Sequence, residues 1–342
     1  MLEQATNAAG SNWKLWLVLA ILVCGLLAIL IWVLRMTQMP LKSYAGELAP
    51  LSAEQKETSA RLSQHIRYLS ETIGERNMPK AGSLDAAAGY IRKTLEQAGY
   101  TVAEQTYSVQ SHSVSNLEAK LAGSGGGETI VVGAHYDSVP GSPGANDNAS
   151  GVAAVLELAR LLAGFKPRRT IRFVLFVNEE PPYFQTGEMG SLVYARQLRR
   201  EQIQVSAMIS LETIGYYSEA PGSQKYPPLL GKLYPDRGNF IGFVGNPASG
   251  ALVREIVRRF RETTKFPSEG VAAPGDWPGI GWSDQWSFWQ EEYPAIMITD
   301  TALFRYPYYH TPHDTIGWID LERMARVVDG VRRVVESLAT EE

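Results

Sequence analysis

The sequence predicts an α/β fold, with a mixed, largely parallel central sheet flanked by helices and one N-terminal transmembrane helix before it. From about residue 129 onward, apolar β-rich runs alternate with amphipathic helical patterns. Such alternation is typical of a parallel sheet covered on both faces. Residues 15–34 contain neither a charge nor a proline. We therefore expect one globular domain behind a membrane anchor.

The anchor is the segment LWLVLAILVCGLLAILIWVL at residues 15–34. At about 1.5 Å per residue it spans roughly 30 Å, the thickness of the hydrocarbon core of a bilayer. It exceeds the apolar part of a secretory signal, about 7–15 residues, and no convincing cleavage site follows it. A buried core helix would show a polar face, and this segment has none. We expect a short tail at 1–14, the transmembrane helix at 15–34 and a linker at 35–52.

Charge and cysteine content narrow the functional classes. The net charge of −4 and the pI near 5.9 give no basic face for nucleic acid. Cys24, the only cysteine, lies inside the apolar segment, so a metal in the rest of the chain must be held by His, Asp or Glu. Lys14 flanks one end of that segment, and Arg35 and Lys42 flank the other. The positive-inside rule therefore leaves the orientation open.

The elements of the domain, residues 53–342, follow in order. Amphipathic patterns predict helices at 53–74 and 83–98, the second with Ser83 as N-cap. A hairpin-like strand pair is expected next. The predicted strands are 101–109, 114–121, 129–135, 170–178, 205–211, 240–244 and 295–299, and the later helices are 149–163, 191–200, 250–264 and 321–338.

Histidines and carboxylates follow the ends of four predicted strands. They are His135, Asp137, Asp147, Glu179, Glu180, Glu212 and His310. Ligands of open α/β sheets bind beyond the carboxyl ends of the strands. Each residue alone has an ordinary explanation, such as a helix N-cap for Asp147 or a hydrogen-bonded loop or core residue for a histidine. We expect the latter for His65, His112 and His313. Their shared location predicts a metal site.

The chemistry of zinc accounts for this set. Zinc binds imidazole nitrogen and carboxylate oxygen, and a two-metal site needs a bridging carboxylate, here Asp147. In the His-x-Asp pattern, Asp137 can accept the second N–H of His135. Adjacent Glu179 and Glu180 point to opposite sides of an extended chain. One can then bind metal while the other faces water as a general base.

Six motifs carry a resemblance to a known family: AHYDS at 134–138, GANDNASG at 144–151, NEE at 178–180, SLETIG at 210–215, SDQ at 283–285 and YHTPHDT at 309–315. In order and spacing they resemble the M28 zinc exopeptidases, from about residue 85 to 335. The resemblance implies a zinc-exopeptidase (phosphorylase/hydrolase-like) fold and two zinc ions. One zinc would be held by Asp147, Glu180 and His310, and the other by His135, Asp147 and Glu212. It also implies that Glu179 is the general base and that Asp137 holds His135.

Two departures from the family pattern concern the site. Glu212 stands where the family usually has Asp, which moves the carboxylate oxygens by roughly one C–C bond length. Gln285 replaces the histidine of the common SDH tripeptide and is expected to alter substrate contacts. Residues 181–188 correspond to a variable loop that is expected to shape the pocket.

The resemblance favours an aminopeptidase acting on peptides with a free N-terminus, with its catalytic domain outside the cytoplasm. One alternative is a single-zinc glutaminyl-cyclase-like aminoacyltransferase. Another is a non-catalytic ectodomain of the same fold, which the complete set of ligand residues disfavours. The sequence contains neither the G-x-S-x-G elbow of serine hydrolases nor an HExxH helix.

Overall fold

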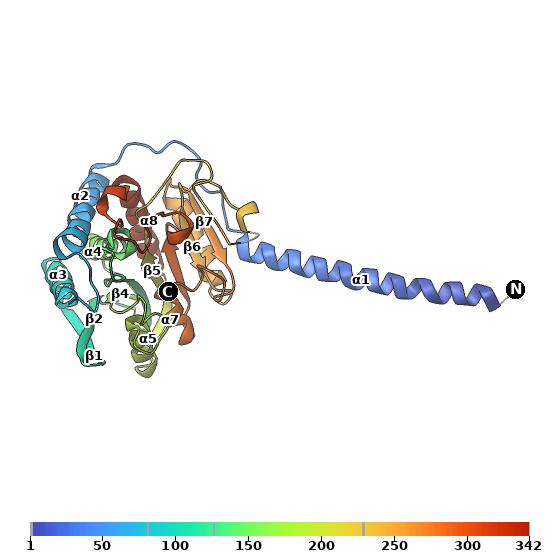
Figure 1. The fold of residues 1–342 in the computed structure, drawn as a ribbon, viewed down its shortest axis with the longest axis horizontal. Coiled ribbons are helices and arrows are strands. Elements are labelled where there is room, and N and C mark those ends of the chain that lie inside the picture. Colours follow the sequence, from blue (N-terminus) through green and yellow to red (C-terminus); the bar gives the residue numbers. More distant parts are fainter. Residues whose placement is uncertain (1–2, 81, 126, 228–229, 342) are drawn as a thin grey trace. The chain divides into compact units, whose positions relative to one another are not determined.

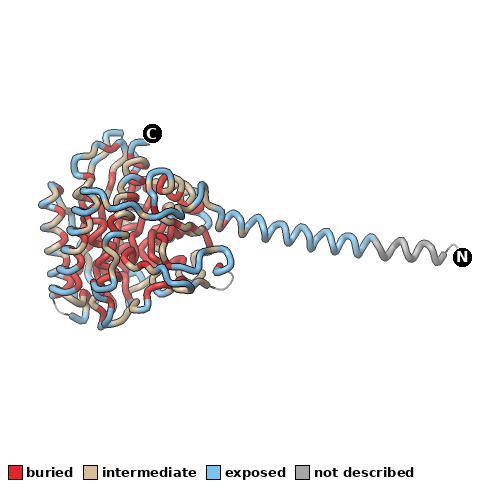
Figure 2. The backbone as a smooth tube through the Cα atoms, turned by 90° about the horizontal axis from the view of Figure 1, so that it is seen from above, coloured by how far each residue is buried: buried red, intermediate tan, exposed pale blue. Residues whose placement is uncertain are grey.

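The computed structural model describes residues 3–80, 82–125, 127–227 and 230–341. It contains two compact units, Met1–Gln38 and Met39–Glu342. Helix α1 (Glu3–Thr37) makes up the first unit and extends beyond the predicted apolar segment at both ends. Its residues Trp13–Thr37 are long and apolar enough to cross a membrane. Most residues of this stretch are exposed (Figure 2).

An eight-stranded sheet forms the centre of the second unit (Figure 1), in the order β1-β2-β4-β3-β5-β8-β6-β7. The strands are β1 (Val102–Val109), β2 (His112–Leu121), β3 (Glu128–His135), β4 (Thr170–Phe176), β5 (Gln204–Glu212), β6 (Ile241–Gly245), β7 (Ser268–Ala272) and β8 (Ala295–Thr299). The central strands β4, β3, β5 and β8 pair in parallel, whereas β1, β2 and β6 add antiparallel pairs. The predicted mixed, largely parallel sheet is confirmed.

Helices cover both faces of the sheet. They are α2 (Ala53–Arg67), α3 (Ser83–Gln97), α4 (Gly151–Leu162), α5 (Gly190–Arg200), α6 (Gly250–Thr263), α7 (Gln285–Gln290) and α8 (Leu321–Thr340). Helices α4, α6 and α8 contact strands through the larger apolar cluster, and α2 packs on α4 and α8. Helices α5 and α7 contact the sheet through a second cluster that contains Tyr194 and Phe288.

The alternation of side chains along each strand explains the two clusters. In β3, Ile130 and Val132 belong to the larger cluster, whereas Val131 between them belongs to the smaller one. Successive side chains of a strand point to opposite faces. Because both faces are covered by helices, β3 is apolar on both sides and is buried from Thr129 to His135.

The structure differs from the predictions in a few elements. Gly82, at φ +75°, is the N-cap of α3, so the N-cap prediction for Ser83 is wrong; the Ser83 hydroxyl donates to Lys80 O instead. Helix α2 ends at Arg67 and continues as the π-helical turn η1 (Tyr68–Ile73). Strand β7 and helix α7 were not predicted, because five and six residues are too short to show a clear period.

The expected linker contributes to the second unit from Met39 onward. Arg261 donates to Pro40 O and Leu41 O at 3.0 and 2.8 Å, and the backbone N–H of Ser268 donates to Ser43 Oγ at 2.9 Å. Ser268 begins β7, the last strand of the sheet. These contacts place the linker beside an edge strand, which otherwise exposes unpaired backbone groups.

Candidate active site

The carboxyl ends of the parallel strands bring the predicted site residues together. His135 is the last residue of β3 and Glu212 the last of β5. Glu179 and Glu180 follow β4 by three and four residues, and His310 lies in the segment after β8. These strands are neighbours in the sheet and run in the same direction, so their ends meet at one edge.

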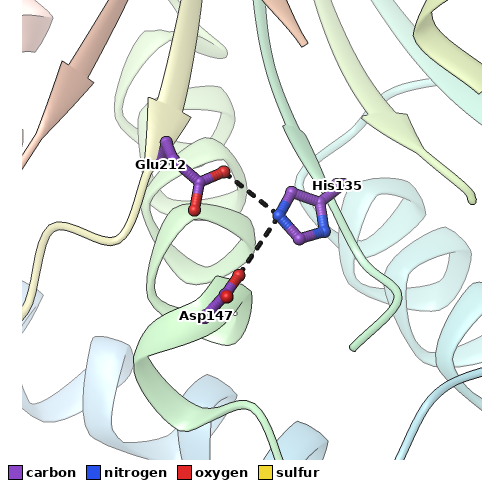
Figure 3. A group of neighbouring side chains, drawn as sticks. All are labelled: His135, Asp147 and Glu212. Atoms are coloured by element: carbon purple, nitrogen blue, oxygen red, sulfur yellow. Dashed lines mark hydrogen bonds and ion pairs between the residues drawn. The ribbon is translucent and has the colours of Figure 1, made fainter. Parts of the chain in front are cut away.

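Asp147 lies between the two histidines. Its Oδ1 is 3.4 Å from His135 Nε2, and its Oδ2 is 3.0 Å from His310 Nε2. Each histidine also contacts its own glutamate: Glu212 Oε2 is 3.1 Å from His135, and Glu180 Oε2 is 3.2 Å from His310. Figure 3 shows the half formed by His135, Asp147 and Glu212. The site therefore has two histidine–glutamate halves joined by one carboxylate.

Asp137 holds both adjacent glutamates in place. Its Oδ1 accepts the backbone N–H of Glu179 and its Oδ2 that of Glu180, each at 3.1 Å. Its Oδ1 also lies 3.4 Å from His135 Nδ1, an ion-pair distance. Glu179 Oε2 lies 3.8 Å from His135 Nε2, on the His135 side, whereas Glu180 reaches His310. Asp137 thus fixes the backbone of Glu179, which lies on the His135 side, and of Glu180, which contacts His310.

Glu212 is fixed by hydrogen bonds as well as by His135. Ser283 Oγ donates to its Oε2 at 2.7 Å, and Asn148 Nδ2 donates to the same oxygen at 3.3 Å. Asn148 also donates to Leu211 O at 2.9 Å. These donors hold the Glu212 side chain, which is longer than the aspartate usual in the family, in contact with His135.

The loop that carries Asp147 depends on glycine and on Asp314. A Cβ on Gly151 would lie 2.3 Å from Leu211 O, so glycine allows the start of α4 to approach β5. Asp314 accepts the backbone N–H groups of Asn146 and Asp147 at 2.8 and 3.0 Å, and Tyr306 OH donates to it at 2.9 Å. Asp314 lies within the YHTPHDT motif, but the sequence pattern did not reveal this role.

Three site segments adopt left-handed backbone conformations at residues other than glycine. Asn178, Thr213 and His310 have φ values of 58°, 43° and 57°. Such values are uncommon, especially for β-branched threonine. Each residue is, or adjoins, a member of the histidine–carboxylate cluster. Strained conformations of this kind cluster at functional sites, where the surrounding contacts hold them.

Buried acidic groups outnumber the histidines. Glu179, Glu180 and Glu212 are at most 6% exposed, and Asp147 and Asp284 at most 3%. Burial raises the pKa of Glu180 and of Asp284 to about 7, and raises that of Glu179 well above its usual range. Burial lowers the pKa of His310, but Asp147 and Glu180 outweigh it and raise that pKa to about 10. Without a cation, the cluster therefore retains protons that an exposed site would release.

The donor set fits divalent metal ions. Ligand atoms of His135, Asp147 and Glu212 lie within 4.8 Å of one another, and so do those of Asp147, Glu180 and His310. His310 Nε2 and Asp147 Oδ2 are close, yet neither forms a hydrogen bond of acceptable geometry within the described part of the chain. A nitrogen and an oxygen that face each other in this way suit a shared cation, and the N/O donor set is one that zinc prefers.

An apolar cavity borders the cluster at Glu212 and Tyr309. Its walls come from β6, β7, the segment before α7 and the segment between β5 and β6, which contributes Tyr226, Leu230 and Tyr234. The ring of Tyr309 stacks on that of His310, with centroids 3.9 Å apart. Sequence reasoning missed the segment between β5 and β6, because it has no period typical of a helix or strand.

Gln285, two nearby tryptophans and His65 differ in their surroundings. Gln285 is fully buried and donates to Ile280 O, and it lines neither this cavity nor the one near Glu180. Trp282 is exposed and lines the apolar cavity, whereas Trp289 packs on the smaller cluster. His65, expected to be structural, hydrogen-bonds Tyr90 OH at 2.7 Å, remote from the cluster.

Comparisons with known proteins identify the family of the chain. The model of peptidase family M28 matches residues 116–335. The uncharacterized protein YfbL of Escherichia coli is 41% identical over 280 residues, covering 79% of this chain and 85% of YfbL. Aminopeptidase YwaD of Bacillus subtilis is 30% identical over 218 residues, which are 61% of this chain but only 40% of YwaD.

Solved structures share the fold. A zinc aminopeptidase from Bacillus subtilis aligns with a TM-score of 0.67 at 18% identity, covering 86% of this chain and 97% of that structure. The glutaminyl cyclase of Fimbriiglobus ruber aligns with a TM-score of 0.61 at 20% identity, with the same coverage of both chains. The chain spans less than half of the length of YwaD, most of YfbL and nearly all of these two solved structures. By its sequence match and its fold, the chain belongs to peptidase family M28 and is a metallopeptidase.

Proposed function

We propose that this chain is a two-zinc aminopeptidase that removes N-terminal residues from peptides. One observation carries the proposal: each oxygen of the buried Asp147 carboxylate faces a different histidine, and each histidine has its own glutamate. His135, Asp147 and Glu212 would hold one zinc, and Asp147, Glu180 and His310 the other. Bound zinc would supply Lewis-acid polarisation of the scissile carbonyl and activation of water.

Glu179 is the proposed general base. Glu179 lies beside the cluster, and Asp137 accepts a hydrogen bond from the backbone N–H of Glu179. Because this contact does not involve the Glu179 carboxylate, that carboxylate can accept and donate a proton. Burial raises its pKa, which suits a group that must both take and return a proton near neutral pH. Glu179 would accept a proton from the attacking water and deliver it to the leaving amine.

The apolar cavity is the proposed site for the side chain of the first residue. It begins at Glu212 and is lined by groups such as Phe243, Met297 and Phe304. An apolar side chain gains roughly 1.5–3 kcal/mol when it is fully buried. We therefore expect a preference for large apolar first residues. The name of aminopeptidase YwaD and the zinc aminopeptidase fold support the same activity.

Helix α1 is the proposed membrane anchor, and the second unit the catalytic domain outside the cytoplasm. The length and apolar composition of residues 13–37 support anchoring. Digestion by an added protease in intact cells, or in spheroplasts if the host has an outer membrane, would support this orientation. Protection until the cells are lysed would contradict it.

The rival activity is cyclisation of an N-terminal glutamine at a single zinc. Two observations support this alternative: the fold is shared with a glutaminyl cyclase, and one of the two proposed metal sites contains Glu212 where the family usually has Asp. Peptides that begin with glutamine separate the two activities. An aminopeptidase releases free glutamine and shortens the peptide. A cyclase lets the N-terminal amine displace ammonia from the side-chain amide, which leaves a five-membered lactam on a peptide that keeps all its residues.

The proposal is tested by Glu179→Gln in the full-length chain, with Glu188→Gln as the matched control. Glu188 is exposed and lies in the loop after the two glutamates. We expect Glu179→Gln to keep its zinc and to lose at least a thousandfold in kcat on leucyl peptides, because no carboxylate remains to move the proton. Glu188→Gln should behave as the native chain. Normal turnover by Glu179→Gln would refute the assigned role.

A further inference from the structure

A second cavity also borders the cluster. It reaches Glu180 and Asp137, whereas the apolar cavity reaches Glu212. Glu212 and Glu180 belong to different halves of the cluster, because they pair with different histidines on the two oxygens of Asp147. The two cavities therefore reach glutamates of different halves of the cluster.

We propose that this second cavity binds the part of the peptide that follows the cleaved bond. This inference rests on the proposed aminopeptidase activity. An aminopeptidase substrate has one residue before the cleaved bond, whose side chain would occupy the apolar cavity. The rest of the peptide must extend away from the cluster by another route. The cavity at Glu180 provides such a route, and its wall contains both polar and apolar residues.

Four separate segments build the wall of the cavity. Residues 77–79 follow η1, and Gln110 and His112 lie at the turn between β1 and β2, where His112 begins β2. The segment after β3 supplies Asp137, Ser138 and Pro140, and the segment after β4 supplies Asn178 and residues 180–183. The first two segments lie before residue 116, where the match to the family begins. Part of the wall of this subsite therefore lies outside the region matched by the family, and the rest lies within it.

The chemistry of the wall suits an uncharged peptide. Prolines, Met78 and Tyr183 provide apolar surface, and Gln110 and His112 provide exposed polar groups. Asn77 is 7% exposed and donates to Ser138 O at 3.3 Å, which leaves its carbonyl oxygen without a hydrogen-bond partner in the described structure. That oxygen is covered, so a rotation of the side chain must accompany any contact with a peptide N–H. The acidic groups Asp137 and Glu180 disfavour an acidic second residue.

The test compares leucinamide, whose leaving group is ammonia, with Leu-Ala-Ala, whose leaving group enters the cavity. His112→Trp adds an indole to the wall at an exposed residue, the first of β2. Ser113→Trp is the matched control, because neighbouring residues of a strand face opposite sides and Ser113 is exposed without lining the cavity. Pro140→Trp fills the cavity from another exposed wall residue.

We expect the ratio of kcat/KM for Leu-Ala-Ala to that for leucinamide to fall at least tenfold in His112→Trp and in Pro140→Trp. In Ser113→Trp the ratio should stay within twofold of native. An unchanged ratio in both cavity variants, or an equal loss on both substrates, would overturn the inference. Failure of the native chain to cleave either substrate would instead refute the proposed aminopeptidase activity.

Discussion

Arg76 is the buried cation on which the loop between His135 and Asp147 depends. Its guanidinium is fully buried and donates to five backbone carbonyl oxygens, at distances of 2.7–3.1 Å. These oxygens belong to Leu69, Gly74, Tyr136, Pro143 and Gly144. Burial lowers the pKa of Arg76 to about 10, against the opposing effect of Asp314 and other nearby carboxylates, so the group stays charged at neutral pH.

Arg76→Met should destabilise the protein strongly, because it keeps most of the volume and removes every donor. A buried carbonyl left without a partner costs about 1–3 kcal/mol. Water that enters the vacated space can bind some of the five carbonyls and so offset part of this cost. We therefore expect the free energy of unfolding to fall by about 4 kcal/mol, a value typical of removing one partner of a buried charged pair. At about 2 °C per kcal/mol for a domain of this size, Tm should fall by roughly 8 °C.

The assay is thermal unfolding of the full-length chain in detergent, with Arg67→Met as the control. Arg67 pairs with Glu71 at 3.0 Å, but its side chain is 57% exposed. Exposed pairs of this kind contribute about 0.3–0.5 kcal/mol, so Tm of the control should shift by about 1 °C at most. Equal Tm values for the two variants would refute the assigned role of Arg76.

Two further predictions concern the cluster. Glu212→Asp withdraws the carboxylate oxygens by about 1.5 Å from Ser283 and His135. The affinity of the zinc proposed to bind His135, Asp147 and Glu212 should therefore fall about tenfold, as measured by calorimetric titration. An unchanged affinity would count against our placement of Glu212. The metal-free protein should lose stability as pH rises from about 4 to 7, since burial raises the pKa of Glu180, Asp284 and Asp314 each to about 7 and the unfolded chain releases those protons at lower pH. Unfolding in chelator at pH 5 and 7.5 measures this, and a flat profile would contradict it.

The fold was predictable where the sequence pattern is long and local. Strands such as β3 and β4 are continuous apolar runs between turns, so their position and burial follow from composition. Strand β7 contains Ser268, Glu269 and Gly270 in five residues at the sheet edge, and no pattern marks it. Helix α7 is a single short run with two tryptophans, too brief for a period to emerge.

The candidate site was predictable because parallel strands end at one edge. That rule brings His135, Glu179 and Glu212 together from segments up to 77 residues apart in the sequence. The rule does not extend to groups that support the site from elsewhere. Arg76 contacts carbonyls 60–68 residues away, and Asp314 contacts backbone N–H groups 167 and 168 residues away. Only the folded chain reveals such partners, since backbone groups carry no sequence signal.

The metal content of the full-length chain, measured together with the release of N-terminal residues, tests the central claim most directly. Leucyl peptides with a free and with an acetylated N-terminus are the substrates, and a chelator is the control. The account predicts close to two zinc ions per chain and chelator-sensitive release of leucine from the free peptide alone. A folded chain that binds no zinc and releases no residue would contradict it.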